Sequence, residues 1–133
     1  MKKEKSCGCV VFNDKFEVLL IHMNQGHWSF PKGHVEKNES EIETALRETL
    51  EETNIKVDID KSFRKVTSYS PHKGMWKDVV FFIGKASNNE IIIQKEELKD
   101  AKFVGIEEAK KLITYRNDLD ILFKAVEHLN IGK

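Results

Sequence analysis

The sequence predicts an α+β fold in which a mixed β-sheet is flanked by helices, an α/β/α layering. Three observations predict it. An apolar hairpin pattern opens the chain, a pattern of helical period follows at residues 40–53, and further strand patterns precede two C-terminal helix patterns. Strands and helices in this order are typical of a sheet that is covered by helices.

Length and composition predict a single domain spanning residues 1–133. Of the 133 residues, 40% are hydrophobic and 33% are charged, values close to those of an ordinary globular domain. The longest apolar run, residues 79–83, is far shorter than the roughly 18 residues of a membrane span. The first apolar stretch ends at Asn13-Asp14-Lys15, too early for a signal peptide. We therefore expect a cytoplasmic protein without membrane contact.

The charge balance bears on partners. The 22 Lys and Arg residues are matched by 22 Asp and Glu residues, so the net charge is zero. Proteins that bind nucleic-acid duplexes usually carry a basic excess that neutralises phosphates. General nucleic-acid binding is therefore not expected, and the sequence leaves the oligomeric state open.

The first half is expected to form a hairpin, a loop and a helix. Apolar, β-rich runs at residues 7–12 and 16–23 are separated by the turn-forming pair Asn13-Asp14. A loop at residues 24–37, which contains glycines and a proline, leads into the helix at residues 40–53.

The second half is expected to complete the sheet and add two helices. An extended segment at residues 55–59 precedes strands at residues 64–70 and 75–85, which should be antiparallel neighbours joined by the turn at residues 71–74. Short strands at residues 91–93 and 102–105 follow, and helices at residues 106–114 and 118–129 close the chain.

Two cysteines lie in the first predicted strand. Cys7 and Cys9 are two residues apart, so both side chains should point to one face of the sheet. Such close neighbours make a poor disulfide framework, and two thiolates cannot complete a zinc site by themselves. We interpret both as small core residues.

The predicted helix at residues 40–53 separates an apolar face from an acidic one. At about 100° per residue, one side carries the residues expected to be buried, namely Ile42, Leu46, Thr49, Leu50 and Thr53. The opposite side gathers Glu48, Glu51 and Glu52. Acidic helix faces are often merely solvated. Here, however, Glu48 and Glu52 repel each other at i,i+4 spacing without a lysine at a matching position, which favours a bound divalent cation such as magnesium.

The segment before the helix supplies further groups for a metal and phosphate site. Gly33 permits a close backbone approach, so its carbonyl is a candidate oxygen ligand. Lys32 and His34 flank it and are candidates to face phosphate groups. The sequence therefore predicts a metal site that a phosphorylated ligand completes.

These residues resemble the Nudix box, G-x5-E-x7-R-E-U-x-E-E-x-G-U, in which U is a bulky apolar residue. The spacing matches without a gap at Gly33, Glu39, Arg47, Glu48, Glu51, Glu52 and Ile55. Two positions depart from it. Asn54 replaces a glycine, a mild change because Asn also caps helices in the left-handed conformation, and Thr49 replaces an apolar residue.

The flanking residues are similar to one branch of the family, the asymmetric diadenosine tetraphosphate hydrolases. The similar segments are residues 31–36, 45–52, 6–12 and 103–109, so the resemblance covers nearly the whole chain. It implies an α/β/α sandwich and an enzyme that hydrolyses nucleoside diphosphate-linked compounds with Mg²⁺ or Mn²⁺. For this branch the implied substrate is diadenosine tetraphosphate, cut asymmetrically to ATP and AMP.

The resemblance also assigns roles by position. Glu48, Glu51 and Glu52 would be metal ligands, with Glu48 the preferred residue to orient or deprotonate the attacking water. Glu97 from a late loop would add a carboxylate, with Glu96 as the alternative. Arg47 and Glu39 would support the motif structurally. Tyr69 and Lys77 lie where the branch contacts base and phosphate, although Tyr69 is also interpretable as a half-buried strand aromatic.

Two other functions remain open. Within the family, the chain would act on oxidised nucleoside triphosphates or on RNA 5′ ends, because the helix glutamates do not select the substrate. A different class is a Nudix domain that binds nucleotides without catalysis. Such domains commonly lose helix glutamates, whereas Glu48, Glu51 and Glu52 are all present, which favours the enzyme.

Overall fold

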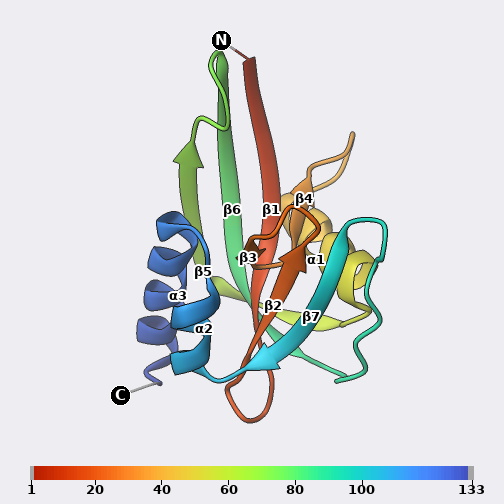
Figure 1. Ribbon diagram of the computed structural model, residues 1–133, viewed down its shortest axis with the longest axis vertical. Helices are drawn as coiled ribbons and strands as arrows, with labels where there is room; N and C mark the ends of the chain where they lie inside the picture. Colours follow the sequence, from red (N-terminus) through yellow and green to blue (C-terminus); the bar gives the residue numbers. More distant parts are fainter. Residues whose placement is uncertain (1, 132–133) are drawn as a thin grey trace.

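The computed structural model describes residues 2–131, which form seven strands and three helices (Figure 1). The elements, in order, are β1 (Lys2–Phe12), β2 (Val18–Met23), β3 (Trp28–Ser29), β4 (Lys32–His34), α1 (Glu41–Thr53), β5 (Val57–Tyr69), β6 (Met75–Ala86), β7 (Leu98–Val104), α2 (Ile106–Leu112) and α3 (Arg116–Leu129). Within these residues, no helix is both long and apolar enough to cross a membrane.

The strands form one mixed sheet, as the sequence predicts. The central order is β3-β2-β1-β6-β5, with β4 paired to β1 and β7 paired to β2. β1 and β6 are parallel over their length, from Lys2 opposite Met75 to Phe12 opposite Lys85, whereas the other pairs are antiparallel. The predicted pairing of the strands on either side of residues 71–74 is confirmed, since Tyr69 lies opposite Lys77.

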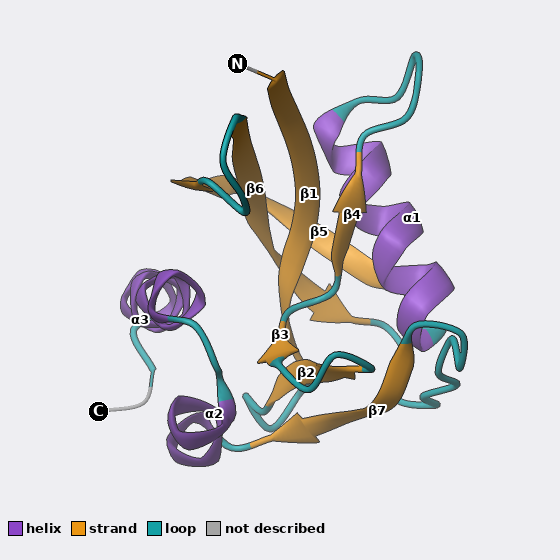
Figure 2. Cartoon of the chain, turned by 45° about the horizontal axis from the view of Figure 1, so that its top comes forward, coloured by secondary structure: helices purple, strands orange, loops and turns teal. Residues whose placement is uncertain are grey.

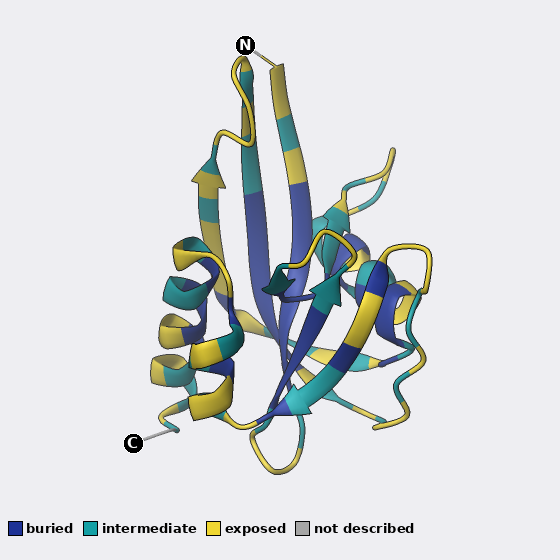
Figure 3. Cartoon of the chain, viewed as in Figure 1, coloured by how far each residue is buried: buried dark blue, intermediate teal, exposed yellow. Residues whose placement is uncertain are grey.

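Helices cover both faces of the sheet, which confirms the predicted layering. α1 lies on one side, and α2 and α3 lie on the other (Figure 2). One apolar cluster contains Val10 and Phe12 of β1 with residues of α2 and α3. The other contains Cys7, Cys9 and Val11 with Ala45 of α1. Alternate residues of β1 thus enter opposite cores, so the strand is buried on both faces from Ser6 onward (Figure 3).

Both cysteines are free and buried in the same cluster, as expected of small core residues. Burial raises the pKa of the Cys7 thiol to about 11 and that of the Cys9 thiol to about 12. Neither thiol is therefore a ready nucleophile at neutral pH.

The segment predicted as one loop at residues 24–37 contains the two short strands β3 and β4. β4 pairs with β1 at Cys7 opposite Gly33 and at Gly8 opposite Lys32. Gly8 makes this pairing possible, because a Cβ there would lie 2.1 Å from the Pro31 carbonyl oxygen and 2.6 Å from Lys32 Cβ. The loop assignment was wrong at these residues since it ignored the space that Gly8 leaves.

The short strand predicted at residues 91–93 is absent. The Ile92 amide donates to the Thr53 carbonyl at 3.0 Å, and the Gln94 amide donates to the Glu52 carbonyl at 3.1 Å. Ile91 and Ile93 pack on the α1-side cluster. The segment therefore satisfies carbonyls at the end of α1 instead of pairing with a strand.

Other boundaries differ by a few residues. The second strand begins at Val18 and not at residue 16, because Phe16 has a positive φ of 57° and lies in the turn. The two extended segments predicted at residues 55–59 and 64–70 form one strand, β5, with an irregularity between Asp60 and Arg64. α2 ends at Leu112 and α3 begins at Arg116.

The buried face of α1 differs from the predicted apolar face. Its buried residues are Thr44, Ala45, Thr49, Glu52 and Thr53, whereas Leu50 is exposed. Small side chains at Ala45 and Thr49 bring the helix close to β1, and the Thr49 hydroxyl donates to the Ala45 carbonyl at 2.8 Å. Close packing against the sheet, not the apolar count, sets the rotation of the helix, and it places Glu52 inside.

Candidate active site

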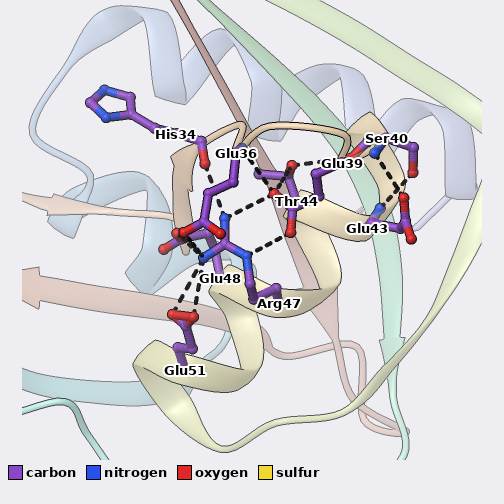
Figure 4. A network of polar contacts seen from close by, with 9 residues as sticks. All are labelled: His34, Glu36, Glu39, Ser40, Glu43, Thr44, Arg47, Glu48 and Glu51. Carbon is purple, nitrogen blue, oxygen red and sulfur yellow. Dashed lines mark hydrogen bonds and ion pairs between the residues drawn. The ribbon is translucent and has the colours of Figure 1, made fainter.

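Both ends of α1 are fixed by local caps, which hold the glutamates in register. Ser40 and Glu43 form a capping box, in which the Ser40 hydroxyl accepts from the Glu43 amide at 3.1 Å and the Glu43 carboxylate accepts from the Ser40 amide at 2.8 Å (Figure 4). Asn54 ends the helix in the left-handed conformation, with φ of 66°. The asparagine thus does what the glycine of the motif does.

Arg47 is the centre of a polar network on α1. Its Nε and Nη2 donate to the two Glu39 carboxylate oxygens at 2.7 and 3.0 Å, and Nη2 also donates to the His34 carbonyl at 3.0 Å (Figure 4). The bond to Arg47, followed by that from Thr44, lowers the pKa of Glu39 to about 2. The expected contact between Arg47 and Glu39 is present, and the bond from Arg47 to the His34 carbonyl ties β4 to the helix.

The same guanidinium also contacts two of the acidic side chains. Arg47 Nη1 lies 2.7 Å from Glu48 Oε2 and 3.1 Å from Glu51 Oε1. Although no lysine lies at a matching position of the helix, Arg47 therefore partly offsets the charges of Glu48 and Glu51. Glu48 directly follows Arg47 in the helix, and the long Arg47 side chain still reaches its carboxylate.

Glu48 lies directly against the backbone of Gly33. A Cβ at residue 33 would stand 2.1 Å from Glu48 Cδ and 2.3 Å from its Oε1. Burial raises the pKa of Glu48, and the bond from Arg47 opposes that shift. The Glu48 carboxylate thus occupies the position that a side chain at residue 33 would take, and it lies there only because residue 33 is glycine.

Glu52 is the most enclosed of the helix glutamates, with only 2% of its surface exposed. Its Oε1 accepts the Lys32 amide hydrogen at 3.0 Å. Burial, reinforced by the neighbouring Glu48 charge, raises the pKa of Glu52 to about 8. Enclosed carboxylates close to one another are costly by themselves, and a divalent cation would offset that cost.

Glu51 and Glu97 lie at the solvent side of this cluster, and both are exposed. The charge of Glu97 contributes to the raised pKa values of Glu48 and Glu52, so the loop before β7 brings it within electrostatic reach of both. Glu96 is tied through its carbonyl, which accepts from the Asn24 side-chain amide at 3.0 Å.

The side chains predicted to bind the metal do not converge on one point. Within residues 2–131, no three His, Cys, Asp or Glu side chains lie close enough together to hold a metal ion. Glu48 and Glu51 instead surround Arg47 Nη1. The chemistry of the donors still fits a hard divalent cation, because the set consists of carboxylate oxygens, with the Glu48 carboxylate lying directly against the Gly33 backbone, and the candidate Gly33 carbonyl oxygen.

A groove of about 680 Å³ lies beside the carboxylates and is shared by several elements. It brings together three of the four residues predicted to bind substrate, namely Lys32, Tyr69 and Lys77. Burial lowers the pKa of Lys77, and the Lys32 charge adds to that effect. Lys32 joins the two regions, because its amide contacts Glu52 while its side chain lines the groove.

His34 does not line this groove. Its side chain is 61% exposed, and its Nε2 lies 3.8 Å from Glu4 Oε1. Figure 4 shows the ring pointing away from the glutamates while the backbone carbonyl faces Arg47. Lys32 and His34 are two residues apart in β4, so strand alternation alone would place both on one face. His34 misses the groove because it lies at the exposed end of the strand, beside Glu4.

Sequence reasoning missed several groove residues, of which His27, Tyr115 and Asp118 carry the most chemistry. The rings of His27 and Tyr115 lie 5.3 Å apart. Their positions follow from the fold: the amide of Thr114 donates to the Trp28 carbonyl, which brings the start of α3 next to the β2–β3 turn. An acidic residue on the inner side of a C-terminal helix was the available signal for Asp118.

The chain is similar to known proteins over nearly all of its length. The NUDIX domain model matches residues 2–125. The asymmetrical bis(5′-nucleosyl)-tetraphosphatase of Mus musculus is 32% identical over 127 residues, covering 84% of this chain and 86% of the mouse protein. The Caenorhabditis elegans protein of the same name is 32% identical over 119 residues, with 84% and 86% covered.

Solved structures give the same result. The crystal structure of a C. elegans Ap4A hydrolase binary complex superposes with a TM-score of 0.86 at 30% identity, covering 96% of this chain and 98% of that one. A MutT protein from Methanosarcina mazei, with 20% identity and a TM-score of 0.75, shares the fold. The motif that runs from Gly33 to Ile55, the layered fold and these matches agree, and the chain belongs to the NUDIX family of hydrolases.

Proposed function

We propose that this chain is a metal-dependent hydrolase that cuts diadenosine tetraphosphate asymmetrically to ATP and AMP. The observation that carries the proposal is the position of Lys32. Its amide contacts the buried Glu52 carboxylate at 3.0 Å, and its side chain enters a groove that also contains Tyr69 and Lys77. A polyphosphate held by the two lysines would extend from the groove toward the helix glutamates.

The metal site would comprise Glu48, Glu51, Glu52 and the Gly33 carbonyl, with Glu97 as an outer carboxylate. Support comes from the oxygen-rich donor set, from the Glu48 carboxylate that lies against the Gly33 backbone and from the Glu48 charge, which adds to burial in raising the pKa of Glu52. When bound, Mg²⁺ or Mn²⁺ would neutralise phosphate charge and lower the pKa of coordinated water.

The groove would bind one nucleoside end. The Tyr69 ring would stack on adenine, an interaction worth roughly 1 to 3 kcal/mol per base. Lys32 and Lys77 would bind the phosphates as point charges. His34, whose ring lies outside the groove, would reach a terminal phosphate only if its side chain turned from Glu4.

The reaction would proceed by water attack on one bridging phosphorus. One P–O bond forms, the opposite P–O bond breaks, the water proton passes to a glutamate and the leaving nucleotide departs as its phosphate anion. Glu48 is the preferred proton acceptor, because its carboxylate lies over the Gly33 backbone where the reacting phosphate would sit. Arg47 and Glu39 would position Glu48 and the β4 backbone without touching the substrate. Positioning and charge neutralisation supply the catalysis, and no covalent enzyme intermediate is needed.

Product analysis tests the substrate assignment. The purified chain with Mg²⁺ is incubated with diadenosine tetraphosphate, with ATP or oxidised nucleoside triphosphates, and with triphosphorylated RNA, and kcat/KM is measured on each. The proposal expects the dinucleotide to be preferred and to yield equal amounts of ATP and AMP. Equal rates on all substrates would contradict the assignment to this branch. Binding of the dinucleotide without hydrolysis would identify a nucleotide-sensing domain instead.

A matched pair of lysine variants tests the groove. Lys77→Gln should raise KM for the dinucleotide, because one phosphate contact is lost. Lys111→Gln, at an exposed position of α2 outside the groove, should leave KM unchanged. If Lys77→Gln had the same KM for the dinucleotide as Lys111→Gln, Lys77 would not contact the phosphates.

A further inference from the structure

Asp118 is a buried carboxylate that the proposed reaction does not use. It lies in the first turn of α3, and only 7% of its surface is exposed. Within the part of the chain that the structure describes, its carboxylate takes part in no hydrogen bond and no ion pair. Burial raises its pKa, and the charge of Lys32 opposes that shift.

Asp118 lines the groove together with Tyr69 and Tyr115. The one fully enclosed side-chain oxygen without a partner in residues 2–131 belongs to Ser6, so the Asp118 oxygens retain access to the groove. The charge of Asp118 also contributes to the raised pKa of Tyr69, which places it within electrostatic reach of the proposed stacking ring. An acceptor that the chain leaves unbonded in the wall of a groove is available to a donor on a ligand.

The chemistry of a carboxylate selects among nucleobases. An ionised carboxylate only accepts hydrogen bonds, and its two oxygens suit two neighbouring N–H donors. Guanine presents such a pair, N1–H and the N2 amino group, on one edge. Adenine presents one amino group next to the N1 acceptor, so one carboxylate oxygen would face a ring lone pair. A site built to accept two donors discriminates strongly against a ligand that lacks one.

We propose that Asp118 reads the base in this groove and favours guanine over adenine, so that guanine-bearing dinucleoside tetraphosphates are preferred substrates. The inference rests on the proposed function, because the groove must bind a nucleoside end. A competing role is purely positional, in which Asp118 fixes Lys32 and affects every nucleotide equally.

A mixed substrate, adenosine–guanosine tetraphosphate, tests the proposal in one reaction. Asymmetric cleavage gives either GMP with ATP or AMP with GTP, according to which base occupies the groove. For the wild type, we expect one product pair to exceed the other by about fivefold or more, a ratio typical of one good bidentate base contact. Asp118→Asn should move the ratio to near unity or reverse it, because the amide replaces one acceptor with a donor.

Controls separate the possible outcomes. Glu127→Gln, an exposed change on the same helix, should keep the wild-type ratio. A wild-type ratio near unity, or an Asp118→Asn ratio equal to that of the wild type with a higher KM for every substrate, would overturn the base-reading role while leaving the proposed function intact.

A second test measures nucleotide binding to the wild type alone, so it depends neither on turnover nor on whether Asp118→Asn folds. The wild type should bind GMP about fivefold or more tightly than IMP, which lacks only the N2 amino group. Equal affinities for GMP and IMP would overturn the proposal. If the wild type hydrolyses no dinucleotide, the proposed function fails, and these two affinities alone decide the role of Asp118.

Discussion

The Glu48 carboxylate occupies the space in which residue 33 would carry a side chain. A Cβ at Gly33 would lie 2.1 Å from Glu48 Cδ, well inside van der Waals contact. The atoms that clash are the far end of a flexible side chain, so Glu48 is able to move aside without disturbing the backbone. The requirement for glycine at residue 33 therefore concerns the position of a carboxylate and not the conformation of the chain.

Gly33→Ala should lower turnover strongly while leaving the fold intact. The added methyl group displaces Glu48 from the Gly33 backbone, and a misplacement of this kind costs on the order of 10²-fold in rate. Activity and the circular dichroism melting curve would be measured together. Gly105→Ala, where a Cβ meets no atom within 4 Å, should retain full turnover. Normal turnover of Gly33→Ala would show that the position of Glu48 against residue 33 is not needed for catalysis.

Glu52→Gln should abolish turnover without loss of stability. Glu52 is buried and accepts one amide hydrogen bond, from Lys32, which a glutamine oxygen is able to accept as well. Burial raises the pKa of the Glu52 carboxyl to about 8, so the folded state disfavours its charge, and a neutral glutamine of the same shape removes that unfavourable contribution. Glu51→Gln, at an exposed position, should likewise lower turnover by orders of magnitude.

The matched control is Ser40→Ala, which removes the N-cap of the same helix. It should lower the free energy of unfolding by about 1 kcal/mol and leave turnover unchanged. Urea denaturation and kcat would be measured on all three variants. Turnover that followed stability across the series, with Ser40→Ala the weakest enzyme, would argue against a catalytic role for the two glutamates.

The ion pairs of Glu41 should make stability depend on acid pH. Arg64 donates to both Glu41 oxygens at 2.8 and 2.9 Å, and Lys5 adds a further contact. These partners lower the pKa of Glu41 from its ordinary value of 4.5 to about 2. A lowered pKa stabilises the folded state above the unfolded-state value, and that contribution is lost as the pH falls through the folded-state value.

Glu41→Gln should therefore destabilise the protein at pH 7, by about 1 kcal/mol for a partly exposed network. The difference from the wild type should shrink between about pH 4.5 and pH 2. Urea denaturation across this range measures it. Arg64→Gln should reproduce the profile, because it removes the main partner. A difference that stayed constant down to pH 2 would show that the pair does not contribute through its charge.

Local signals predicted α1 and its chemistry from the sequence. The capping pair Ser40 and Glu43, the helical period and the left-handed Asn54 are all encoded within a few residues of one another. The spacing of Gly33, Arg47 and the glutamates likewise reflects one local unit. Such features depend little on the rest of the fold, so the local sequence is enough to predict them.

Non-local packing explains what the sequence did not reveal. β4 forms because Gly8, 24 residues earlier than Lys32, leaves room for it. The isoleucines at residues 91–93 have strand propensity, yet their amides bond the end of α1. Asp118 joins the groove only because α3 packs beside β5. In each case, a contact between distant segments overrides the local preference.

Binding of a divalent cation by the helix glutamates and Gly33 is measured directly with Mn²⁺. Electron paramagnetic resonance would follow the loss of the free Mn²⁺ signal with the wild type and with Glu52→Gln, each with and without a non-hydrolysable dinucleoside tetraphosphate. The wild type should take up Mn²⁺ beyond what the ligand binds alone, Mg²⁺ should compete for the site, and Glu52→Gln should lose this uptake. Equal uptake by the two proteins, or none by the wild type even with ligand, would contradict binding of the cation at this site.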